Sequence, residues 1–224
     1  MRGIVQGKMM IKDWIAAADT LSTALVLDAL DAEGFRRQAL PNIPPRTAAR
    51  VTVGQAKPLL WVDFAHDDPD TYALELQAVD SIAPHDLVVC ATANSDRSGI
   101  WGELLTTAAL QRGAAGIVTD GAVRDLSEME AMGFPVFARH LSPYDSMNRQ
   151  KVVAFDVAVE IDGVGVAPGD IVVADRDGIA VVPQGVAAAV LARALEKARA
   201  EDGFRAAVKA GMSLTEAYAK FRVL

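Results

Sequence analysis

Two short segments between residues 99 and 125 contain the residue types from which a small binding site can be built. The first, Gly99-Ile-Trp-Gly102-Glu103-Leu104-Leu105, is typical of a helix start opened by glycine. The second, Gly113-Ala-Ala-Gly-Ile-Val-Thr-Asp120-Gly-Ala-Val-Arg124-Asp125, predicts a short buried strand that ends in a polar turn. A free helix N-terminus, a guanidinium and two carboxylates would then meet at one place. Such a set can hold a divalent metal ion and a small carboxylate substrate.

Each of these groups has a binding role that its chemistry supports. The first turn of a helix near Gly102 leaves backbone N–H groups without intrahelical partners, and the helix dipole adds positive charge there. Arg124 can hold a carboxylate through two parallel hydrogen bonds, and Asp125 can bind Mg²⁺ or Mn²⁺. Polar residues directly after a buried strand lie at the sheet edge where α/β proteins bind ligands. The alternative is that Arg124 and Asp125 cap the next helix and form surface ion pairs.

The sequence lacks the patterns of several other kinds of site. No histidine has a partner at a zinc-ligand spacing. No Gly-x-Ser-x-Gly motif marks a nucleophilic serine, and no glycine-rich phosphate loop or Gly-x-Gly-x-x-Gly motif marks a nucleotide site. The single cysteine, Cys90, lies in an apolar run and is interpreted as a buried structural thiol. ATP, NAD and a methyl donor are therefore not expected.

Up to about residue 140 the chain alternates between helical and strand-like segments. Helices are predicted from about residue 19 to Gly34 and over 69–82, 102–112 and 125–132, and strands over 50–54, 86–93, 117–119 and 134–138. Such an order favours parallel β-α-β units.

The pattern changes after residue 150. Strands are predicted over 152–161, 171–174 and 179–182, separated by tight-turn residues, which favours antiparallel or mixed β structure. After Pro183 the chain is predicted helical to its end, with breaks at Gly203 and Gly211 and a capping box from Ser213. We therefore divide the chain into an α/β domain that carries the candidate catalytic site (residues 1–183) and a helical C-terminal arm (residues 184–224). The arm either packs on the same subunit or on a neighbouring one.

Composition limits the class of protein. The chain has 224 residues, of which 51% are hydrophobic, which is enough for the core of one α/β domain. A net charge of −7 without any Lys/Arg run argues against a nucleic-acid partner. No apolar run approaches the ~20 residues that span a bilayer, and no secretory signal is recognised. We therefore expect no membrane partner and a cytoplasmic location.

Four motifs together resemble the family of regulators of ribonuclease activity A and their relatives. The motifs are Gly102-Glu-Leu-Leu105, Gly113-Ala-Ala-Gly116, Asp120-Gly-Ala-Val-Arg124-Asp125 and Pro168-Gly-Asp-Ile-Val-Val-Ala-Asp175-x-Asp-Gly-Ile. The relatives include metal-dependent 4-hydroxy-4-methyl-2-oxoglutarate aldolases, which also decarboxylate oxaloacetate, and the helical tail is similar to that of the aldolase-type members. The resemblance, over roughly residues 20–183, implies an α/β fold: a swivelling-type β/β/α domain with a mixed sheet and a C-terminal helical arm. It also implies a homo-oligomer, either a trimer or a hexamer.

The resemblance assigns roles to individual residues. Substrate binding would fall to Gly102, Glu103, Leu104, Leu105 and Arg124. Asp125 would bind the divalent metal, Mg²⁺ or Mn²⁺. Glu103 would lie near metal-bound waters, at a position where some aldolases have aspartate. In the aldolases a glutamate from a neighbouring subunit's arm reaches the site, and Glu201 is the nearest candidate here, followed by Glu196.

These roles predict a divalent-metal-dependent lyase that acts on small 2-oxo acids. It would cleave compounds like 4-hydroxy-4-methyl-2-oxoglutarate to pyruvate, decarboxylate oxaloacetate, or do both, with the metal stabilising the pyruvate enolate. A Schiff-base route is disfavoured because the candidate lysines, Lys57 and Lys151, are far from the motifs in sequence. The alternative function is a non-enzymatic regulator that binds a ribonuclease, which would need neither the Arg124-Asp125 pair nor the long tail. A quinone methyltransferase would need a methyl-donor site that the sequence lacks.

Overall fold

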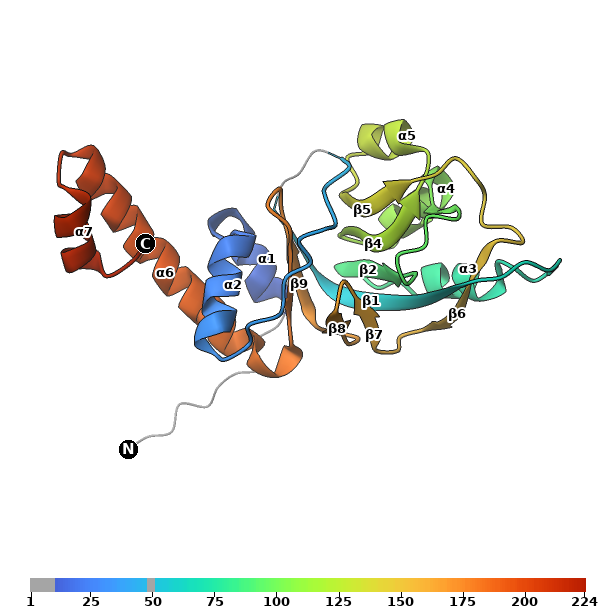
Figure 1. The fold of residues 1–224 in the computed structure, drawn as a ribbon, viewed down its shortest axis with the longest axis horizontal. Helices are drawn as coiled ribbons and strands as arrows, with labels where there is room; N and C mark the ends of the chain where they lie inside the picture. Colours follow the sequence, from blue (N-terminus) through green and yellow to red (C-terminus); the bar gives the residue numbers. More distant parts are fainter. Residues whose placement is uncertain (1–10, 48–50) are drawn as a thin grey trace.

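The computed structural model describes residues 11–47 and 51–224 (Figure 1). Its helices are α1 (Ile11–Ala17), α2 (Thr23–Ala32), α3 (Ala73–Asp80), α4 (Glu103–Gln111), α5 (Leu126–Ala131), α6 (Ala187–Lys209) and α7 (Leu214–Phe221). Its strands are β1 (Thr52–Asp63), β2 (Asp86–Ala91), β3 (Gly99–Trp101), β4 (Gly116–Val123), β5 (Val136–Leu141), β6 (Gln150–Phe155), β7 (Val159–Ile161), β8 (Val164–Val166), β9 (Ile171–Ala174) and β10 (Ile179–Val182). Among these described residues, no helix combines the length and the apolar character needed to cross a membrane.

An eight-stranded sheet with both parallel and antiparallel pairs forms the centre of the fold. β2 lies parallel to β1 and β4, and β3 and β5 both pair in parallel with β4. β9 lies antiparallel to the first half of β1, β6 to its second half, and β10 to β9. β7 and β8 form a separate hairpin. The predicted α/β class is confirmed, with parallel units first and antiparallel strands after residue 150.

Two groups of helices cover different parts of this sheet (Figure 1). α3, α4 and α5 lie beside the parallel strands and share a core that includes Trp61 and Ile100. α1, α2 and the first part of α6 pack with β9 and β10 around Val26 and Val190. The β7–β8 hairpin contributes Val159 to a third cluster with side chains of β2, β4 and β9. The start of α4 therefore lies in the first group, away from the helical arm.

Several predicted boundaries change in the structure. Residues 99–101 form strand β3 rather than part of the helix start, and α4 begins directly after it, as predicted near Gly102. The prediction of one strand over 152–161 is wrong, because the chain turns between β6 and β7, where Asp156 has a left-handed φ of 54°. The predicted break at Gly203 is also wrong, since α6 is continuous through it.

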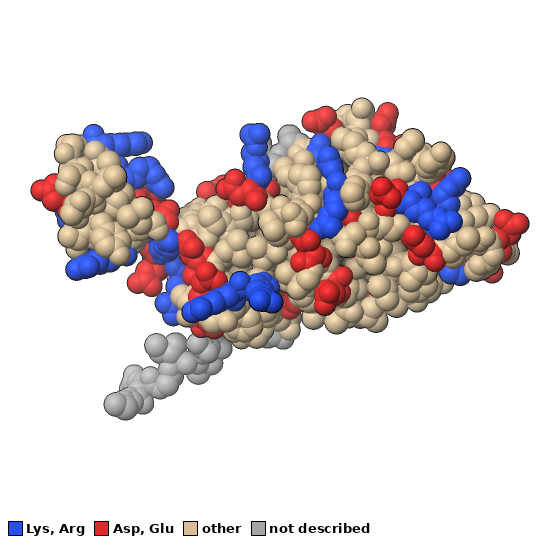
Figure 2. Space-filling model, in the orientation of Figure 1, with Lys and Arg blue, Asp and Glu red and all other residues tan. Residues whose placement is uncertain are grey.

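Gly203 instead allows α7 to fold back on α6. A Cβ at this position would lie 2.8 Å from the ring of Phe221, which packs edge-on against Phe204 with 6.4 Å between ring centroids. The break at Gly211 and the capping box between Ser213 and Glu216 are confirmed. The second part of α6 and α7 stand clear of the rest of the chain (Figures 1 and 2). On the face that Figure 2 shows, acidic and basic side chains are interspersed.

Candidate functional site

The start of α4 and the end of β4 meet at one edge of the sheet. Parallel pairing sets Trp101 opposite Val123, so Gly102 and Arg124, which follow these strands, come out side by side. The Arg124 backbone N–H donates to the Trp101 carbonyl at 2.9 Å. The Asp125 carboxylate accepts a hydrogen bond from the backbone N–H of the first α4 residue, with 3.2 Å between Oδ2 and N. The structure thus brings together the two segments that the sequence singled out.

Gly102 is required by the close approach of Asp125. An added Cβ would lie 2.5 Å from Asp125 Oδ2 and 3.1 Å from Arg124 Cγ. The φ of Gly102, −151°, is extended backbone open to any residue, so the restriction is steric rather than conformational. Asp125 has a left-handed φ of 54°, which aspartate and asparagine tolerate better than most residues. The local backbone therefore directs the Asp125 carboxylate across the helix start.

A pocket of about 300 Å³ opens beside this contact. Its wall contains charged and hydroxyl side chains together with apolar ones. The lining residues are Tyr72, Glu75, Leu76, Gly99, Ile100, Gly102, Leu104, Leu105, Arg124, Asp125, Asp145 and Ser146. The volume and the mixed lining suit a ligand with one or two carboxylates and a short carbon chain.

Two carboxylates hold the Arg124 side chain. Its Nη2 lies 2.8 Å from Asp145 Oδ2, and its Nε lies 3.8 Å from Asp125 Oδ2. The Tyr72 hydroxyl donates to the other oxygen of Asp145. Burial opposes ionisation of Asp145, but hydrogen bonds from Tyr72 and the Met147 N–H, together with Arg124, outweigh it and lower the pKa of this carboxyl. The pocket therefore contains an ionised Asp145 whose charge fixes the guanidinium.

Glu75 is a pocket residue that the sequence analysis did not identify. It lies in the first turn of α3 and is 4% exposed, and its Oε2 is fully buried without a hydrogen-bond partner among the described residues. Burial, and then the negative charge of Asp145, raise the pKa of Glu75 to about 8. A signal was present in the sequence, because Glu75 shares the buried face of its helix with Ala78 and Val79. An acidic residue on an apolar helix face is unusual because an unpaired carboxyl is costly to bury.

This carboxyl makes the stability of the fold depend on pH. The pKa of Glu75 in the folded chain, about 8, exceeds its ordinary value of 4.5, so the folded state keeps a proton that the unfolded state has released. The resulting stabilisation is complete below about pH 4.5 and is lost as the pH rises towards 8. We expect Glu75→Gln to match the wild type near pH 4.5 and to exceed its stability at higher pH, by at most ~5 kcal/mol. Urea unfolding at several pH values measures this difference, and a difference independent of pH would contradict the expectation.

Most of the residues predicted for the site line this pocket. They are Gly102, Leu104, Leu105, Arg124 and Asp125. The backbone N–H of Glu103 donates to the Asp125 carboxylate. The Glu103 carboxylate itself accepts a hydrogen bond from Thr107 at 3.3 Å and is not part of the pocket wall. Glu196 and Glu201 lie on α6, which runs away from the sheet on the side opposite α4 (Figure 1), and neither lines the pocket. A single chain does not bring these two glutamates to the pocket.

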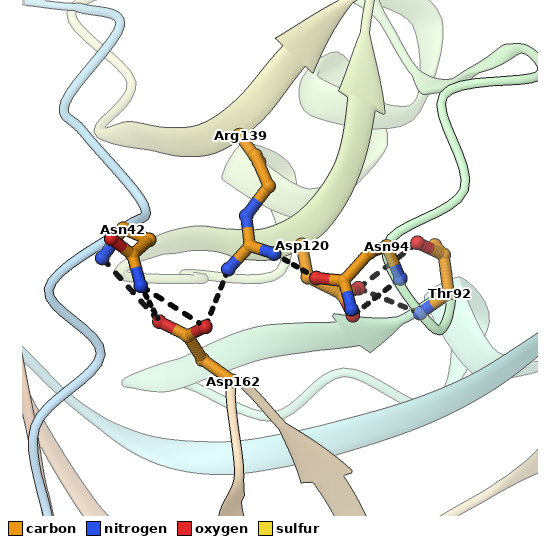
Figure 3. Close-up of polar contacts among 6 residues, drawn as sticks. All are labelled: Asn42, Thr92, Asn94, Asp120, Arg139 and Asp162. Atoms are coloured by element: carbon orange, nitrogen blue, oxygen red, sulfur yellow. Dashed lines mark hydrogen bonds and ion pairs between the residues drawn. The ribbon is translucent and has the colours of Figure 1, made fainter.

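Asp120 does not belong to this pocket, contrary to the prediction of a polar turn after a short strand. β4 continues past Asp120, which is buried within it. Its carboxylate accepts hydrogen bonds from the Thr92 N–H and hydroxyl at 2.7 and 3.0 Å and from the Asn94 N–H at 2.9 Å (Figure 3). The strand tolerates this carboxylate because the loop after β2 supplies its partners. Asp120 therefore orders that loop rather than binding a ligand at the pocket.

Asp125 is the pocket residue best suited to hold a metal ion. Among the described residues, no cluster of three or more His, Cys, Asp or Glu side chains could form a protein-only metal site. The Asp125 side chain is 44% exposed, and the absence of a Cβ at Gly102 keeps space beside its Oδ2. One carboxylate completed by water and substrate oxygens is a ligand set typical of Mg²⁺. The residues present fit a Mg²⁺ or Mn²⁺ ion and do not fit a closed zinc site.

No lysine lines the described pocket. Lys57 is buried and pairs with Asp156 at 2.9 Å, and Lys151 pairs with Asp68 at 2.6 Å. A Schiff-base nucleophile needs an unpaired, desolvated amine next to the substrate. Neither candidate lysine meets this requirement.

Comparisons with known proteins place these features in a family. A family model described as RraA-like, Aldolase/RraA, matches residues 23–181. A Halalkalibacterium halodurans protein provisionally named as a 4-hydroxy-4-methyl-2-oxoglutarate aldolase is 29% identical over 206 residues, which cover 92% of this chain and 93% of that protein. The Legionella pneumophila protein DlpA is 27% identical over 198 residues, covering 88% of this chain but 32% of DlpA. This chain thus spans about a third of the length of DlpA.

A solved structure shows the same fold. The crystal structure of Streptomyces coelicolor RraAS2, described as an unusual member of the RNase ES inhibitor RraA protein family, matches with a TM-score of 0.77 and 28% identity. The match covers 86% of this chain and 96% of that chain. The segment matched by the family model contains both loops that form the pocket. The chain therefore belongs to the RraA-like family.

Proposed function

We propose that the chain is a divalent-metal-dependent lyase that cleaves a carbon–carbon bond in small 2-oxo acids. One reaction would be the cleavage of compounds like 4-hydroxy-4-methyl-2-oxoglutarate to pyruvate and a second carbonyl compound. The other would be the decarboxylation of oxaloacetate to pyruvate, and the chain would catalyse either or both. The observation that carries the proposal is the convergence of the α4 N-terminus, Arg124 and Asp125 on one pocket. The aldolase name of a relative that aligns over nearly its whole length supports the same class of reaction.

The pocket residues would divide the binding of a 2-oxo acid among them. Asp125 would hold the cation, which when bound supplies Lewis-acid stabilisation of the charge that develops on the 2-oxo oxygen. The first-turn N–H groups of Leu104 and Leu105 have no intrahelical acceptor and can receive the substrate carboxylate. Arg124, held in place by Asp145, adds positive charge at the same end of the pocket.

Proton removal from the substrate hydroxyl needs an acceptor near the mouth of the pocket. Glu103 begins α4 and is partly exposed, with its carboxylate in contact with Thr107. We assign it the role of accepting this proton through solvent. No covalent bond between substrate and protein is needed, in agreement with the absence of lysine from the described pocket.

Pyruvate release tests the proposed function directly. The purified chain is incubated with racemic 4-hydroxy-4-methyl-2-oxoglutarate or with oxaloacetate, with Mg²⁺ or Mn²⁺, and then with a chelator. We expect turnover with metal, its loss with chelator and its recovery when metal is restored. Turnover that resists the chelator, or no pyruvate from either substrate, would overturn the proposal. In the latter case, inhibition of an RNase ES-type enzyme would favour the protein-binding regulator.

Arg124→Ala is expected to lower kcat/KM for pyruvate formation by about 10- to 150-fold. The variant removes a charged hydrogen-bond donor worth about 1.5–3 kcal/mol. Steady-state kinetics at saturating Mg²⁺ measure the loss. Arg112→Ala is the matched control, because Arg112 pairs with Asp80 at the other end of α4 and surface ion pairs contribute little. An unchanged kcat/KM in Arg124→Ala would remove this residue from the site.

Gly102→Ala is expected to reduce metal-dependent turnover at least tenfold. The added Cβ would meet the Asp125 carboxylate at 2.5 Å, and relieving such an overlap costs about 1–3 kcal/mol and displaces the carboxylate. The control is Gly165→Ala, where an added Cβ meets nothing within 4 Å. Titration with Mn²⁺ and steady-state kinetics test both variants. Wild-type metal affinity and turnover in Gly102→Ala would show that the contact is dispensable.

We further propose that the working form is a homo-oligomer, a trimer or a hexamer, in which the arm of one copy completes the pocket of another. Glu201, or failing it Glu196, would be the contributed residue. In a single chain the arm leaves large apolar side chains in solvent, with Leu214 62% and Tyr218 45% exposed. Apolar side chains on an amphipathic helix that stands clear of its own core favour burial against another surface.

A further inference from the structure

The Glu75 carboxyl is a buried acid without a partner inside the proposed active site. It lines the pocket with Arg124 and Asp125, and its Oε2 has no hydrogen-bond partner among the described residues. The groups that could have neutralised it are otherwise engaged. The Arg124 guanidinium pairs with Asp145 at 2.8 Å, and the Tyr72 hydroxyl donates to that same aspartate. Among the described residues, Glu75 therefore has neither an ion-pair partner nor a hydrogen-bond donor for its Oε2.

The charged and titratable groups on the elements around Glu75 either oppose the ionisation of its carboxyl or favour it too weakly to matter. Asp145, in the segment after β5, raises the pKa of Glu75 further after burial, and Arg124, at the end of β4, lowers it too weakly to compensate. Tyr72, just before α3, stays neutral because burial and the Asp145 contact raise its pKa to about 12. Cys90 on β2 is fully buried, and burial raises the pKa of its thiol. The carboxyl thus keeps its proton near neutral pH.

The proposed reaction needs a proton donor that the residues assigned so far do not supply. Cleavage of the carbon–carbon bond leaves the enolate of pyruvate, which becomes pyruvate only when its C3 carbon gains a proton. Arginine does not act as a proton donor in proteins, and Tyr72 has too high a pKa to donate well. Asp145 is ionised because its pKa is lowered, and Asp125 is the proposed metal ligand, so neither carries a proton to give. Among the described residues that line the pocket, Glu75 is the acid whose protonation state matches the task.

We propose that Glu75 is the catalytic acid that protonates C3 of the pyruvate enolate, an assignment that rests on the proposed lyase function. The Glu75 O–H bond breaks and a C3–H bond forms. The electron pair of the enolate double bond becomes the new C–H bond, and the C2 carbonyl re-forms. The Glu75 carboxylate then regains a proton from solvent. In the aldol cleavage, solvent has already received a proton from the substrate hydroxyl, so the protons balance. In decarboxylation the enolate is the same, and the proton comes from solvent alone.

Hydrogen exchange of pyruvate tests this step apart from bond cleavage. Protonation run in reverse removes a methyl hydrogen from bound pyruvate, so the enzyme with Mg²⁺ in D₂O should replace these hydrogens by deuterium. Proton NMR measures the loss of the methyl signal. We expect Glu75→Gln to slow the exchange by at least about 10²-fold, the usual contribution of a general acid or base. Pyruvate binding with Mg²⁺, measured by calorimetry, should change little, because the amide fills the same space.

Two further variants separate proton transfer from a structural effect. Glu75→Asp keeps an acid on a shorter side chain and should retain part of the exchange that Glu75→Gln loses. Glu130→Gln, at an exposed position on α5, should behave as the wild type. If Glu75→Gln exchanges hydrogens at the wild-type rate, the assignment is overturned. It is also overturned if both Glu75→Gln and Glu75→Asp lose pyruvate binding to the same extent as they lose exchange. A wild-type enzyme that neither exchanges nor forms pyruvate would overturn the lyase function itself, and this role with it.

Discussion

Replacing Asp125 by asparagine is expected to reduce metal-dependent pyruvate formation by at least about 10³-fold and to leave the fold intact. The loss follows from removing the charged ligand of the cation, whose stabilisation of the reacting oxygen is worth several kcal/mol. Asparagine is a sharper test than alanine, because residue 125 has a φ of 54° and asparagine tolerates this left-handed conformation. Alanine would add backbone strain and so mix a structural effect with a chemical one.

Kinetics, metal titration and unfolding together check the Asp125→Asn result. We expect the Mn²⁺ affinity and kcat/KM to fall together while the unfolding midpoint stays close to that of the wild type. Asp96→Asn is the matched control, since Asp96 is an exposed aspartate in the loop after β2. If Asp125→Asn keeps wild-type turnover and metal affinity, the metal site lies elsewhere in the protein.

The core of the candidate site was predictable because it depends on local rules. A buried strand followed by polar residues, and a helix opened by glycine, both place functional groups at the carboxyl edge of a parallel sheet. The register of β3 and β4 then brings Gly102 beside Arg124. The sequence patterns defined both segments, although β3 itself was too short to be recognised. The parallel pairing of β1 with β2, of β2 with β4 and of β4 with β5 agrees with the predicted β-α-β order.

The rest of the pocket depends on contacts between segments distant in sequence. Tyr72 and Asp145 meet across 73 residues, and no local pattern marks either of them. The prediction of a polar turn at Asp120 failed for the same reason, because the partners of its carboxylate, Thr92 and Asn94, lie 26 to 28 residues earlier in the chain. Glu75 did carry a signal in its helical spacing. That signal points to burial, whereas the absence of a partner is visible only once the neighbouring elements are placed.

The helical arm illustrates how packing decides between two interpretations of one pattern. Its apolar residues at helical spacing predict a buried face but not the surface that covers it. In the structure the first part of α6 buries Val190, Leu191 and Ala194 with α2 of the same chain. Deleting residues 184–224 would therefore also expose the core of the chain itself. Removing only the residues after Gly211 leaves this part of α6 in place and takes away α7.

Truncation after Gly211 is expected to reduce both the size of the assembly and its activity. The full chain of 23.7 kDa should behave as three or six copies in multi-angle light scattering. Loss of α7 removes the exposed Leu214 and Tyr218 and the contact that folds α7 back on α6, so we expect smaller particles. Activity should fall at least about tenfold, because the arm would no longer hold its glutamate at the neighbouring pocket. A monomeric full chain at micromolar concentration would contradict both parts of this expectation.

Point variants on the arm separate assembly from chemistry. Glu201 lies between Lys197 and Arg205, at 3.8 and 3.9 Å, and these long contacts leave its carboxylate available to another copy. Glu201→Gln should keep the assembly size of the wild type and lower kcat by about 10²-fold, as expected for a group that helps to move a proton. Glu196→Gln is the matched variant and should remain active, whereas the reverse result would assign the role to Glu196. If both variants keep full activity in an intact assembly, the arm holds the copies together without contributing to the reaction.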